Sequence, residues 1–353
     1  MIHNKTIKIT VYTVIFTTLI WLVLAFRSGT FIPHDSRMAV KPNELTLDGF
    51  SHQKKIIELE STSVAYLDIG EGPPLILLHG CPFSVYEWIE IIPALSKHYR
   101  IIAPDLLGLG DTPVRLDQDY RLPTDALMVK QLMEKLEIPS ASFIAHDHGG
   151  ATLQLLMKED SHLIDQAIMS NVEAYDQWPS KPELPYLKAI VNPITSPLMY
   201  AAMQFEFIQR DVFSIAVEDV NTLTAEITKG FSLPHSATAE RWQRLRRFFT
   251  WQLDEQHNAV TNTAVEAMKK FEKPMLLIWG ELDENFGPDL ARRLAKDIPG
   301  VKGISFMKNS QHMPMLEEDE AYVSTALDFL LHGKVTNEAV KELEKARIGG
   351  ASK

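Results

Sequence analysis

The sequence predicts an α/β fold: a mostly parallel β-sheet with helices on both faces and a helical insertion. Two observations lead to this prediction. Short apolar runs alternate with helical patterns along most of the chain, and this alternation is typical of a parallel sheet covered by crossover helices. Between about Asn171 and Lys273 the alternation stops, and the segment is helical in pattern and rich in Phe, Trp and Met. We therefore expect a helical cap inserted before the penultimate strand.

The individual elements follow from apolar runs and from helical spacing. Paired strands are expected at 56–59 and 64–67, and buried strands at 75–78, 101–103, 142–145, 166–169, 275–279 and 303–307. A helix is expected at 123–136, with Thr124 as a possible N-cap. Further helices are expected at 241–253, where Trp242, Leu245 and Phe249 lie opposite several arginines, and at 318–331.

Residues 9–26 form an uncharged apolar stretch that, at about 1.5 Å per residue, just spans the hydrocarbon layer of a bilayer. Lys5 and Lys8 precede it, which favours an N-terminus in the cytosol. We expect an uncleaved transmembrane anchor with the rest of the chain on the non-cytosolic side, periplasmic in a bacterium. The alternative is a cleaved signal peptide and a secreted protein, although no small-x-small cleavage site follows.

The expected domain organisation has six parts. They are a cytosolic N-terminus (1–8), the anchor (9–26), a linker (27–53), an α/β core (54–171 and 274–333), a helical cap (172–273) and a charged tail (334–353), for which a frayed helix is one reading.

Composition excludes several classes of function. The net charge of −11, from 46 acidic and 35 basic residues, argues against nucleic acid as a partner, because phosphate binding needs a basic face. The single cysteine, Cys81, excludes an internal disulfide framework and any metal site built from several cysteines.

The segment after the strand predicted at 142–145 reads Ala145-His146-Asp147-His148-Gly149-Gly150, which has the form of a nucleophile elbow. This sharp strand–turn–helix motif strains the backbone of the nucleophile and needs small neighbours, here Ala145 and Gly149. Asp147 stands where serine is usual; a helix-capping aspartate is the structural alternative. A carboxylate is already ionised at neutral pH and needs no base to become a nucleophile. It suits displacement at saturated carbon, which leaves a stable ester on the enzyme.

Other candidate catalytic groups follow other strands. His312 lies after the last predicted strand, and Asp283 follows the strand at 275–279, so both are expected where open sheets place their sites. Asp283 could orient the imidazole and stabilise its protonated form, and Glu173 is the alternative acid. The backbone N–H groups of Cys81 and His148 could form an oxyanion hole.

The order Asp147, Asp283, His312 is the chain order of nucleophile, acid and histidine in the α/β-hydrolase fold. From about 74 to 331 the sequence resembles that superfamily. It is most similar to the branch with aspartate nucleophiles, the haloalkane dehalogenases and epoxide hydrolases. The resemblance rests on these three positions, on His79-Gly80-Cys81-Pro82 and on Asp105-Leu106-Leu107-Gly108-Leu109-Gly110-Asp111. It implies a substrate site between the sheet and a helical cap, and no cofactor; we expect no metal site.

The sequence also departs from the pattern of this branch. Haloalkane dehalogenases typically hold the halide with a tryptophan just after the nucleophile and often with an asparagine in the His-Gly-x-Pro turn, but His148 and Cys81 occupy these positions. Epoxide hydrolases use two cap tyrosines to protonate the opening ring. Val172-Glu173 followed by Asp176-Gln177-Trp178-Pro179 resembles a dehalogenase subgroup whose acid lies at the glutamate. The candidate leaving-group or pocket residues are His148, Tyr175, Tyr186, Tyr200 and Trp178.

We therefore expect a hydrolase that acts on a small apolar organic substrate and water. In the expected mechanism Asp147 forms an alkyl-enzyme ester, and His312, held by Asp283, activates the water that hydrolyses it. An epoxide-hydrolase-like activity is favoured because both usual halide ligands are missing. Haloalkane dehalogenation is the first alternative. The second is a non-catalytic, membrane-tethered binding protein on a hydrolase scaffold, and the third is an ester hydrolase with unusual chemistry.

Overall fold

The computed structural model describes residues 2–31, 53–254 and 256–348. An eight-stranded sheet runs through it in the order β1-β2-β4-β3-β5-β6-β7-β8. The first two strands, β1 (Lys55–Glu58) and β2 (Ser63–Ile69), pair antiparallel, and β2 is antiparallel to β4. The other pairs are parallel; these strands are β3 (Pro74–Leu78), β4 (Arg100–Pro104), β5 (Ala141–His146), β6 (Ile164–Ser170), β7 (Met275–Gly280) and β8 (Val301–Met307). Both the predicted fold class and the predicted strands are confirmed.

Both faces of the sheet are buried, as uninterrupted apolar strands require. In β3, Leu75 and Leu77 belong to one hydrophobic cluster, while Ile76 and Leu78 belong to the other. Two successive side chains of a strand point to opposite faces, so β3 supplies the centre of both layers.

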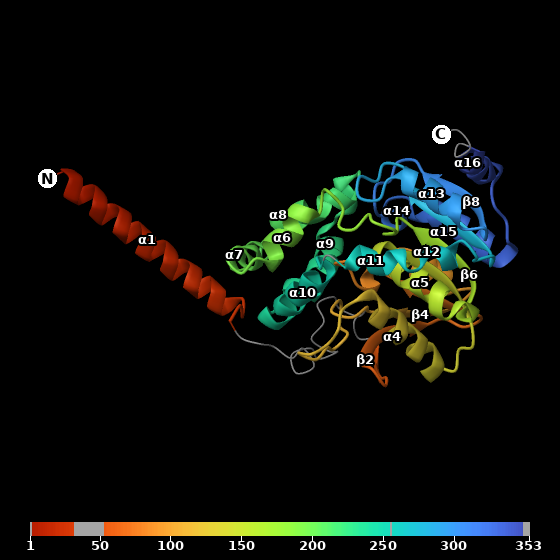
Figure 1. Ribbon diagram of the computed structural model, residues 1–353, viewed down its shortest axis with the longest axis horizontal. Helices are drawn as coiled ribbons and strands as arrows, with labels where there is room; N and C mark the ends of the chain where they lie inside the picture. The colour runs from red at the N-terminus through yellow and green to blue at the C-terminus, as the bar shows by residue number, and fades with distance from the viewer. Residues whose placement is uncertain (1, 32–52, 255, 349–353) are drawn as a thin grey trace.

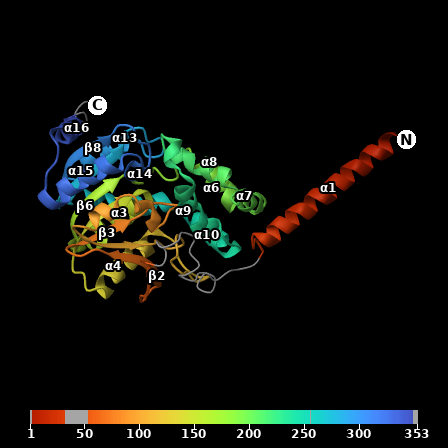
Figure 2. The same cartoon turned by 180° about the vertical axis from the view of Figure 1, so that it is seen from behind.

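Helices cover the two faces of the sheet (Figures 1 and 2). Buried residues of α4 (Leu122–Lys135), α5 (Asp147–Glu159) and α13 (Pro288–Asp297) join the cluster that contains Ile76. Those of α3 (Ile92–Leu95), α14 (Pro314–Glu317) and α15 (Asp319–His332) join the other cluster.

One local expectation needs correction, and a second becomes more definite. The N-cap of α4 is Arg121 rather than Thr124, because the helix begins at Leu122 with Pro123 in its first turn. The predicted charged tail is largely a helix, α16 (Asn337–Ile348), that packs on β8 and α13 and buries Ala339 and Leu343. The spacing of these two apolar residues is four positions, which places them on one side of a helix.

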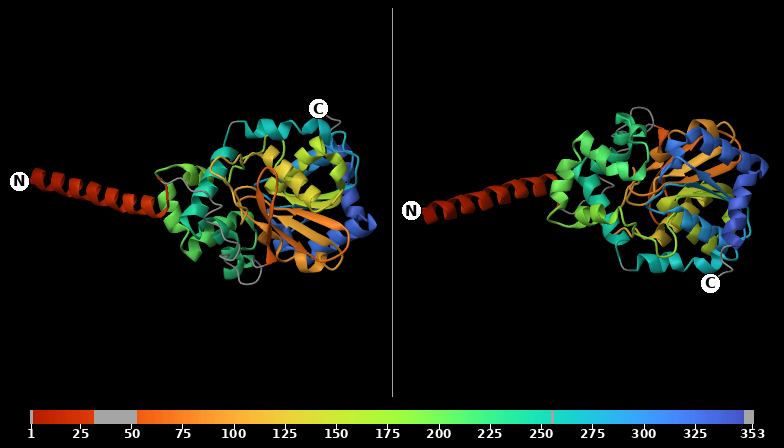
Figure 3. Two further views of the ribbon diagram at one scale, coloured as in Figure 1. Left: turned by 90° about the horizontal axis from the view of Figure 1, so that it is seen from below. Right: turned by 90° about the horizontal axis from the view of Figure 1, so that it is seen from above.

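The described residues between β6 and β7 form helices and no strand (Figure 3). These helices are α6 (Leu184–Val191), α7 (Ser196–Ala202), α8 (Glu206–Phe213), α9 (Ala225–Ser236), α10 (Ala239–Gln252), α11 (His257–Asn262) and α12 (Val265–Met268). Residues Trp242, Leu245 and Phe249 of α10 are buried, as expected.

The expected polar face of α10 is only partly right. Arg241 and Arg244 are 3% and 0% exposed, and their guanidinium groups donate to the carbonyl oxygens of Gly110 and Pro234. Arginine is suited to this because its fixed fork of donors can satisfy several carbonyls at once. These contacts fasten α10 and α9 to the loop that follows β4.

The first helix, α1 (Ile2–Arg27), projects from the molecule and contacts α7 at its C-terminal end (Figures 1 and 3). The indole N–H of Trp21 donates to the carbonyl of Ile194 (2.8 Å), and the Gln243 amide donates to the carbonyl of Ser28 (2.5 Å). Ala25 and Ser28 are buried at this junction.

Among the described residues, no helix is both long enough and apolar enough to span a bilayer. On this finding the predicted anchor at 9–26, and the location beyond a membrane that depended on it, are wrong. A spanning helix needs about 20 predominantly apolar residues, whereas threonines recur in this stretch and its last turns pack against protein. The expected linker at 27–53 falls mostly outside the described residues.

Candidate active site

The candidate site is built on the junction between β5 and α5. Asp147 is the first residue of α5 and has a positive φ of 47°, a strained conformation for a residue with a side chain. The turn is possible because Gly149 has no side chain: a Cβ there would lie 2.2 Å from the carbonyl oxygen of Leu78. The elbow geometry that the sequence predicted is therefore present, with Asp147 at its tip.

The carboxylate of Asp147 reaches the turn after β3. Its Oδ2 accepts a hydrogen bond from the backbone N–H of Cys81 (2.7 Å). Gly80 allows this approach, because a Cβ there would lie 2.7 Å from Oδ2. The other predicted donor, the N–H of His148, belongs to the first turn of α5, where amides have no intrahelical partner. Burial, and next the charge of Asp147, raise the pKa of the Cys81 thiol well above its usual value, which disfavours the thiolate.

Polar contacts fix the turn that holds Cys81. The Glu87 carboxylate accepts from the N–H of Gly80 (2.9 Å), and the Nε2 atom of His79 accepts from the N–H of Leu106 (2.9 Å). His79 Nδ1 therefore carries the proton and donates to the carbonyl of Gly80 (2.7 Å). Both ends of the turn are held by side chains that are themselves buried.

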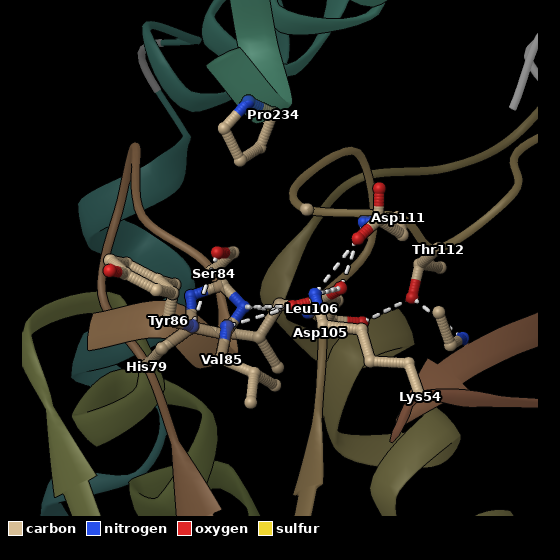
Figure 4. A network of polar contacts seen from close by, with 12 residues as sticks. Lys54, His79, Ser84, Val85, Tyr86, Asp105, Leu106, Asp111, Thr112 and Pro234 are labelled. Atoms are coloured by element: carbon tan, nitrogen blue, oxygen red, sulfur yellow. Dashed lines mark hydrogen bonds and ion pairs between the residues drawn. The ribbon is translucent and has the colours of Figure 1, made fainter. Parts of the chain in front are cut away.

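A buried ionic network supports the same turn from the loop after β4 (Figure 4). Asp105 Oδ1 accepts from the N–H of Val85 (2.8 Å), and its Oδ2 accepts from the N–H of Asp111 (2.8 Å). Lys54 Nζ lies 2.6 Å from Asp105 and 2.9 Å from Asp111. The Asp105–Asp111 segment singled out in the sequence thus acts as a support for the Cys81 turn.

His312 and Asp283 meet in the structure. His312 Nδ1 lies 3.1 Å from Asp283 Oδ2, and the Asn171 side chain donates to the same Oδ2 (2.6 Å). The other oxygen, Oδ1, accepts from the N–H of Asn285 (2.7 Å). Within the described residues, neither His312 Nε2 nor Asp147 Oδ1 has a hydrogen-bond partner. The imidazole is therefore held at one nitrogen and available at the other.

The charges of the site act on one another. Burial lowers the pKa of His312, but the charge and hydrogen bond of Asp283, and then the charges of Asp147 and Glu183, raise it to about 9. Burial, the largest influence, raises the pKa of Asp147, against the attraction of His312. The acidic groups near His312 thus favour the protonated form of its imidazole.

The alternative acid, Glu173, lies in a different cluster. Its Oε1 is 2.9 Å from His257 Nε2, and its Oε2 is 3.4 Å from His148 Nδ1. The opposite nitrogen of His148, Nε2, lies 3.6 Å from Asp125 Oδ2. All four side chains are buried. The geometry thus brings Asp283, not Glu173, to His312.

Sequence reasoning missed this cluster because it did not consider His257 or Asp125. Ligand atoms of His148, Glu173 and His257 all lie within 4.8 Å of one another, so these residues could hold a metal ion. Their hydrogen bonds and ion pairs also account for the arrangement without one. The packing of His148 against Phe248 and His257 shows that its ring is turned into the protein interior.

A small apolar cavity, about 60 Å³ in volume, lies between the sheet and the insertion. Cys81 and His312 line it from the sheet, and Trp178 and Tyr186 line it from the insertion. A second cavity of about 40 Å³ also borders Tyr186 and continues toward α10. The remaining lining residues of the first cavity are Pro82, Phe83, Glu183, Leu187, Ile190, Val212, Phe213, Ile215, Ala216 and Phe249.

The other candidate pocket residues lie elsewhere. Tyr175 donates to Asp297 (2.9 Å) and stacks under Arg293, and Tyr200 packs against Trp242. Trp178 does line the cavity, but its indole N–H donates to the carbonyl of Gln252 (2.8 Å). Of the three candidate tyrosines, the structure brings Tyr186 to the cavity.

Sequence reasoning also missed Glu183, an acidic residue among the apolar lining of the cavity. It precedes α6, one turn before Tyr186. Burial raises its pKa to about 7, and the charge of Asp147 acts in the same direction. The available signal was an acidic residue within the predicted helical cap, three positions before a tyrosine.

Comparison with known proteins identifies the family. Residues 73–319 match the family model of the alpha/beta hydrolase fold. The chain belongs to this family. A haloalkane dehalogenase from Mesorhizobium japonicum is 25% identical over 273 residues, which cover 75% of this chain and 86% of that protein. A soluble epoxide hydrolase from Corynebacterium sp. is 34% identical over 119 residues, which cover 32% of this chain but only 41% of that protein.

Solved structures agree on the fold. A haloalkane dehalogenase from Bradyrhizobium elkani aligns with a TM-score of 0.64 at 21% identity, covering 79% of this chain and 97% of that one. A meta-cleavage product hydrolase from Pseudomonas fluorescens aligns with a TM-score of 0.63, also at 21% identity, covering 79% and 98%. Together with the family match, the curated relatives place this α/β hydrolase in the branch of haloalkane dehalogenases and epoxide hydrolases. It is a hydrolytic enzyme.

Proposed function

We propose that this α/β hydrolase opens small apolar epoxides with water, using Asp147 as the nucleophile. The observation that carries the proposal is the arrangement around its carboxylate. One oxygen is held by the N–H of Cys81, and the other has no partner in the described structure. The charge of this carboxylate acts on His312 and raises its pKa. An aspartate in this place can attack saturated carbon without prior deprotonation. Residues 172–273 would act as the cap that closes the substrate site.

The chemistry divides into two steps. In the first, Asp147 attacks an epoxide carbon and forms an ester. In the second, His312, oriented by Asp283, takes a proton from a water that attacks the ester carbonyl. The N–H groups of Cys81 and His148 stabilise the oxyanion; loss of one such donor costs about 10²–10³ in rate in other enzymes.

Charge connects the two steps. Part of the elevated pKa of His312 comes from the negative charge of Asp147. The ester has no such charge, so its formation lowers the pKa of the imidazole. As its pKa falls, His312 releases its proton to solvent and becomes the neutral base that the second step needs. It takes up a proton from solvent again when the Asp147 carboxylate is restored.

The leaving group decides between the two activities of the branch. A halide needs N–H donors, but His148 is turned into the interior and the indole of Trp178 is occupied. An oxygen leaving group needs an acid, and two groups that can donate O–H, Glu183 and Tyr186, line the cavity. These contacts favour an epoxide.

Haloalkane dehalogenation is the second candidate. The observation in its favour is the extent of the alignment. This chain aligns with 86% of the dehalogenase relative but with only 41% of the epoxide hydrolase relative. Parallel measurement of diol formation and of bromide release, on an epoxide and an alkyl bromide of the same carbon skeleton, separates the two activities.

The test of the proposal is to trap the ester. We expect His312→Gln to form the ester and to hydrolyse it very slowly, because only the second step needs the base. Incubation with styrene oxide or 1,2-epoxybutane should add the mass of one substrate to the intact protein, and peptide mapping should place it on Asp147.

Two controls complete the experiment. His98→Gln, a substitution of an exposed histidine, should turn over normally and accumulate no adduct. The double variant Asp147→Asn, His312→Gln should form none. Absence of an adduct from His312→Gln with both epoxides contradicts the proposal.

A further inference from the structure

Glu183 is an acidic residue of the insertion that lies in the cavity beside the proposed reaction centre. It lines the same small cavity as Cys81 and His312, among aromatic and aliphatic side chains. Ser180 Oγ donates to its Oε2 (2.6 Å), and Ser180 also contacts Asn285, 2.9 Å away. Since Asn285 donates its N–H to Asp283, a short chain of polar contacts links Glu183 to the support of His312.

The charges around Glu183 favour its neutral form. It is influenced by three groups of the sheet side: Asp147, His312 and Asp283. When Asp147 and Asp283 are ionised and His312 is protonated, these three side chains together carry a net charge of −1. A third carboxylate in an apolar cavity would add a second uncompensated charge, which is costly. Burial, and next the charge of Asp147, accordingly raise the pKa of Glu183 to about 7.

We propose that Glu183 is the general acid that protonates the epoxide oxygen as the ring opens. This proposal rests on the proposed function and deepens it, because it assigns the leaving-group proton to one residue of the insertion. The proposal implies the substrate class: a molecule with a strained ring C–O bond, the oxygen of which becomes a hydroxyl group of the product.

The proton and electron balance of the cycle closes with these groups and solvent, to which His312 gives its resting proton before the second step and from which it regains one at the end. Asp147 forms a C–O bond, the ring C–O bond breaks, and its electron pair takes the proton of Glu183. Water then adds to the ester carbonyl and gives a proton to His312, which passes it to the departing alkoxide. Asp147 is released as a carboxylic acid and returns its proton to the Glu183 carboxylate. The net reaction is epoxide plus water to diol.

The alternative donors are less well placed. His148 lies between two carboxylates, 3.4 Å from Glu173 and 3.6 Å from Asp125, and its ring is turned into the interior. Tyr186 lines the cavity one turn further along α6. It can orient the oxygen, and the experiment separates its contribution from that of Glu183.

The experiment measures kcat/KM for styrene oxide between pH 5.5 and 9. The unchanged protein should lose activity above pH 7, because the Glu183 carboxyl loses its proton there. Glu183→Gln should lower kcat/KM at pH 6 by about 10²–10⁴ and should abolish this pH dependence, and Glu183→Asp should restore part of both. Glu206→Gln, which changes an exposed glutamate at the start of α8, is the matched control and should behave as the unchanged protein.

The outcomes separate this inference from the proposed function. If His312→Gln forms no ester with the epoxide, the proposed function fails and Glu183 has no role as acid. If the ester forms, and the double variant Glu183→Gln, His312→Gln forms it as fast as His312→Gln alone, the proposed function stands and the assignment of Glu183 is wrong. The assignment would also be wrong if Tyr186→Phe abolished the loss of activity above pH 7 and Glu183→Gln left it in place.

Discussion

Two histidine–carboxylate systems lie close to Asp147, and they differ in what their nitrogen atoms contact. His312 is bound to Asp283 through Nδ1, and it lines the cavity with Nε2 unpartnered in the described structure. In the other system, Glu173 is shared between His257 and His148, and Asp125 faces the far side of His148. The chemical components are the same. Access of one nitrogen to the cavity suits the first pair to proton transfer, whereas enclosure suits the second to holding the fold.

The acids of the two systems are alike. Both acids follow a strand directly, Glu173 after β6 and Asp283 after β7. Each accepts hydrogen bonds on both oxygens. The comparison therefore rests on the partner imidazoles, and replacing each acid by its amide is the direct way to examine it.

The largest expected effect is on hydrolysis of the trapped ester. We expect Asp283→Asn to slow this step by about 10⁴, by analogy with the loss of the orienting aspartate in a serine protease. Glu173→Gln should slow it less than tenfold, because Glu173 does not contact His312. Single-turnover decay of the ester, followed by intact mass, measures both. A larger loss in Glu173→Gln than in Asp283→Asn would reverse the assignment of the acid.

The next effect concerns stability. Removal of one partner from a buried ion pair typically costs about 3–5 kcal/mol, so Glu173→Gln should lower the free energy of unfolding by about 3 kcal/mol. His312→Gln should lower it less, because Asp283 keeps its hydrogen bonds from the Asn171 side chain and the Asn285 N–H. Urea denaturation at pH 6 compares the two. Equal losses would show that both systems hold the fold.

The smallest expected effect is the pH dependence of that stability. Burial raises the pKa of Glu173, but the charges of His257 and His148 outweigh it and lower the pKa to about 2. Its contribution is therefore present above its usual value of 4.5 and is lost as the pH falls toward 2. Burial lowers the pKa of His148, but Glu173 and Asp125 raise it to about 10, so its contribution is full below the usual 6.5 and is lost as the pH rises toward 10.

The two windows overlap between about pH 4.5 and 6.5. The difference in unfolding free energy between the unchanged protein and Glu173→Gln should be greatest there and should shrink on both sides. Denaturation series at pH 4, 5.5 and 8.5 measure this difference, and the exposed substitution Glu206→Gln serves as the reference. A difference that does not vary with pH would mean that the cluster is not ionised as described.

The sequence was informative where signals are local. Uninterrupted apolar runs located the strands to within about two residues, because strands buried on both faces need such runs. The elbow at Asp147 and the positions of Asp283 and His312 followed from their places after strands. The partners of Glu173 did not, because His257 comes from a helix of the insertion, 84 residues further along the chain.

The insertion explains the other failures. Glu183 and Tyr186 reach the cavity only through the packing of α6, and the interior orientation of His148 depends on contacts with Phe248 and His257. Likewise, the end of α1 is held by a carbonyl of Ile194, which no pattern within 9–26 reveals. Contacts between distant segments decide each of these, and a single sequence shows them only weakly.

The division between sheet and insertion has a practical consequence for engineering. The groups that would make and hydrolyse the covalent bond stand at strand ends, whereas the proposed proton source stands on a segment entering between β6 and β7. A mutant library restricted to 180–190 could therefore retarget the enzyme toward a different departing atom and leave its attacking group untouched.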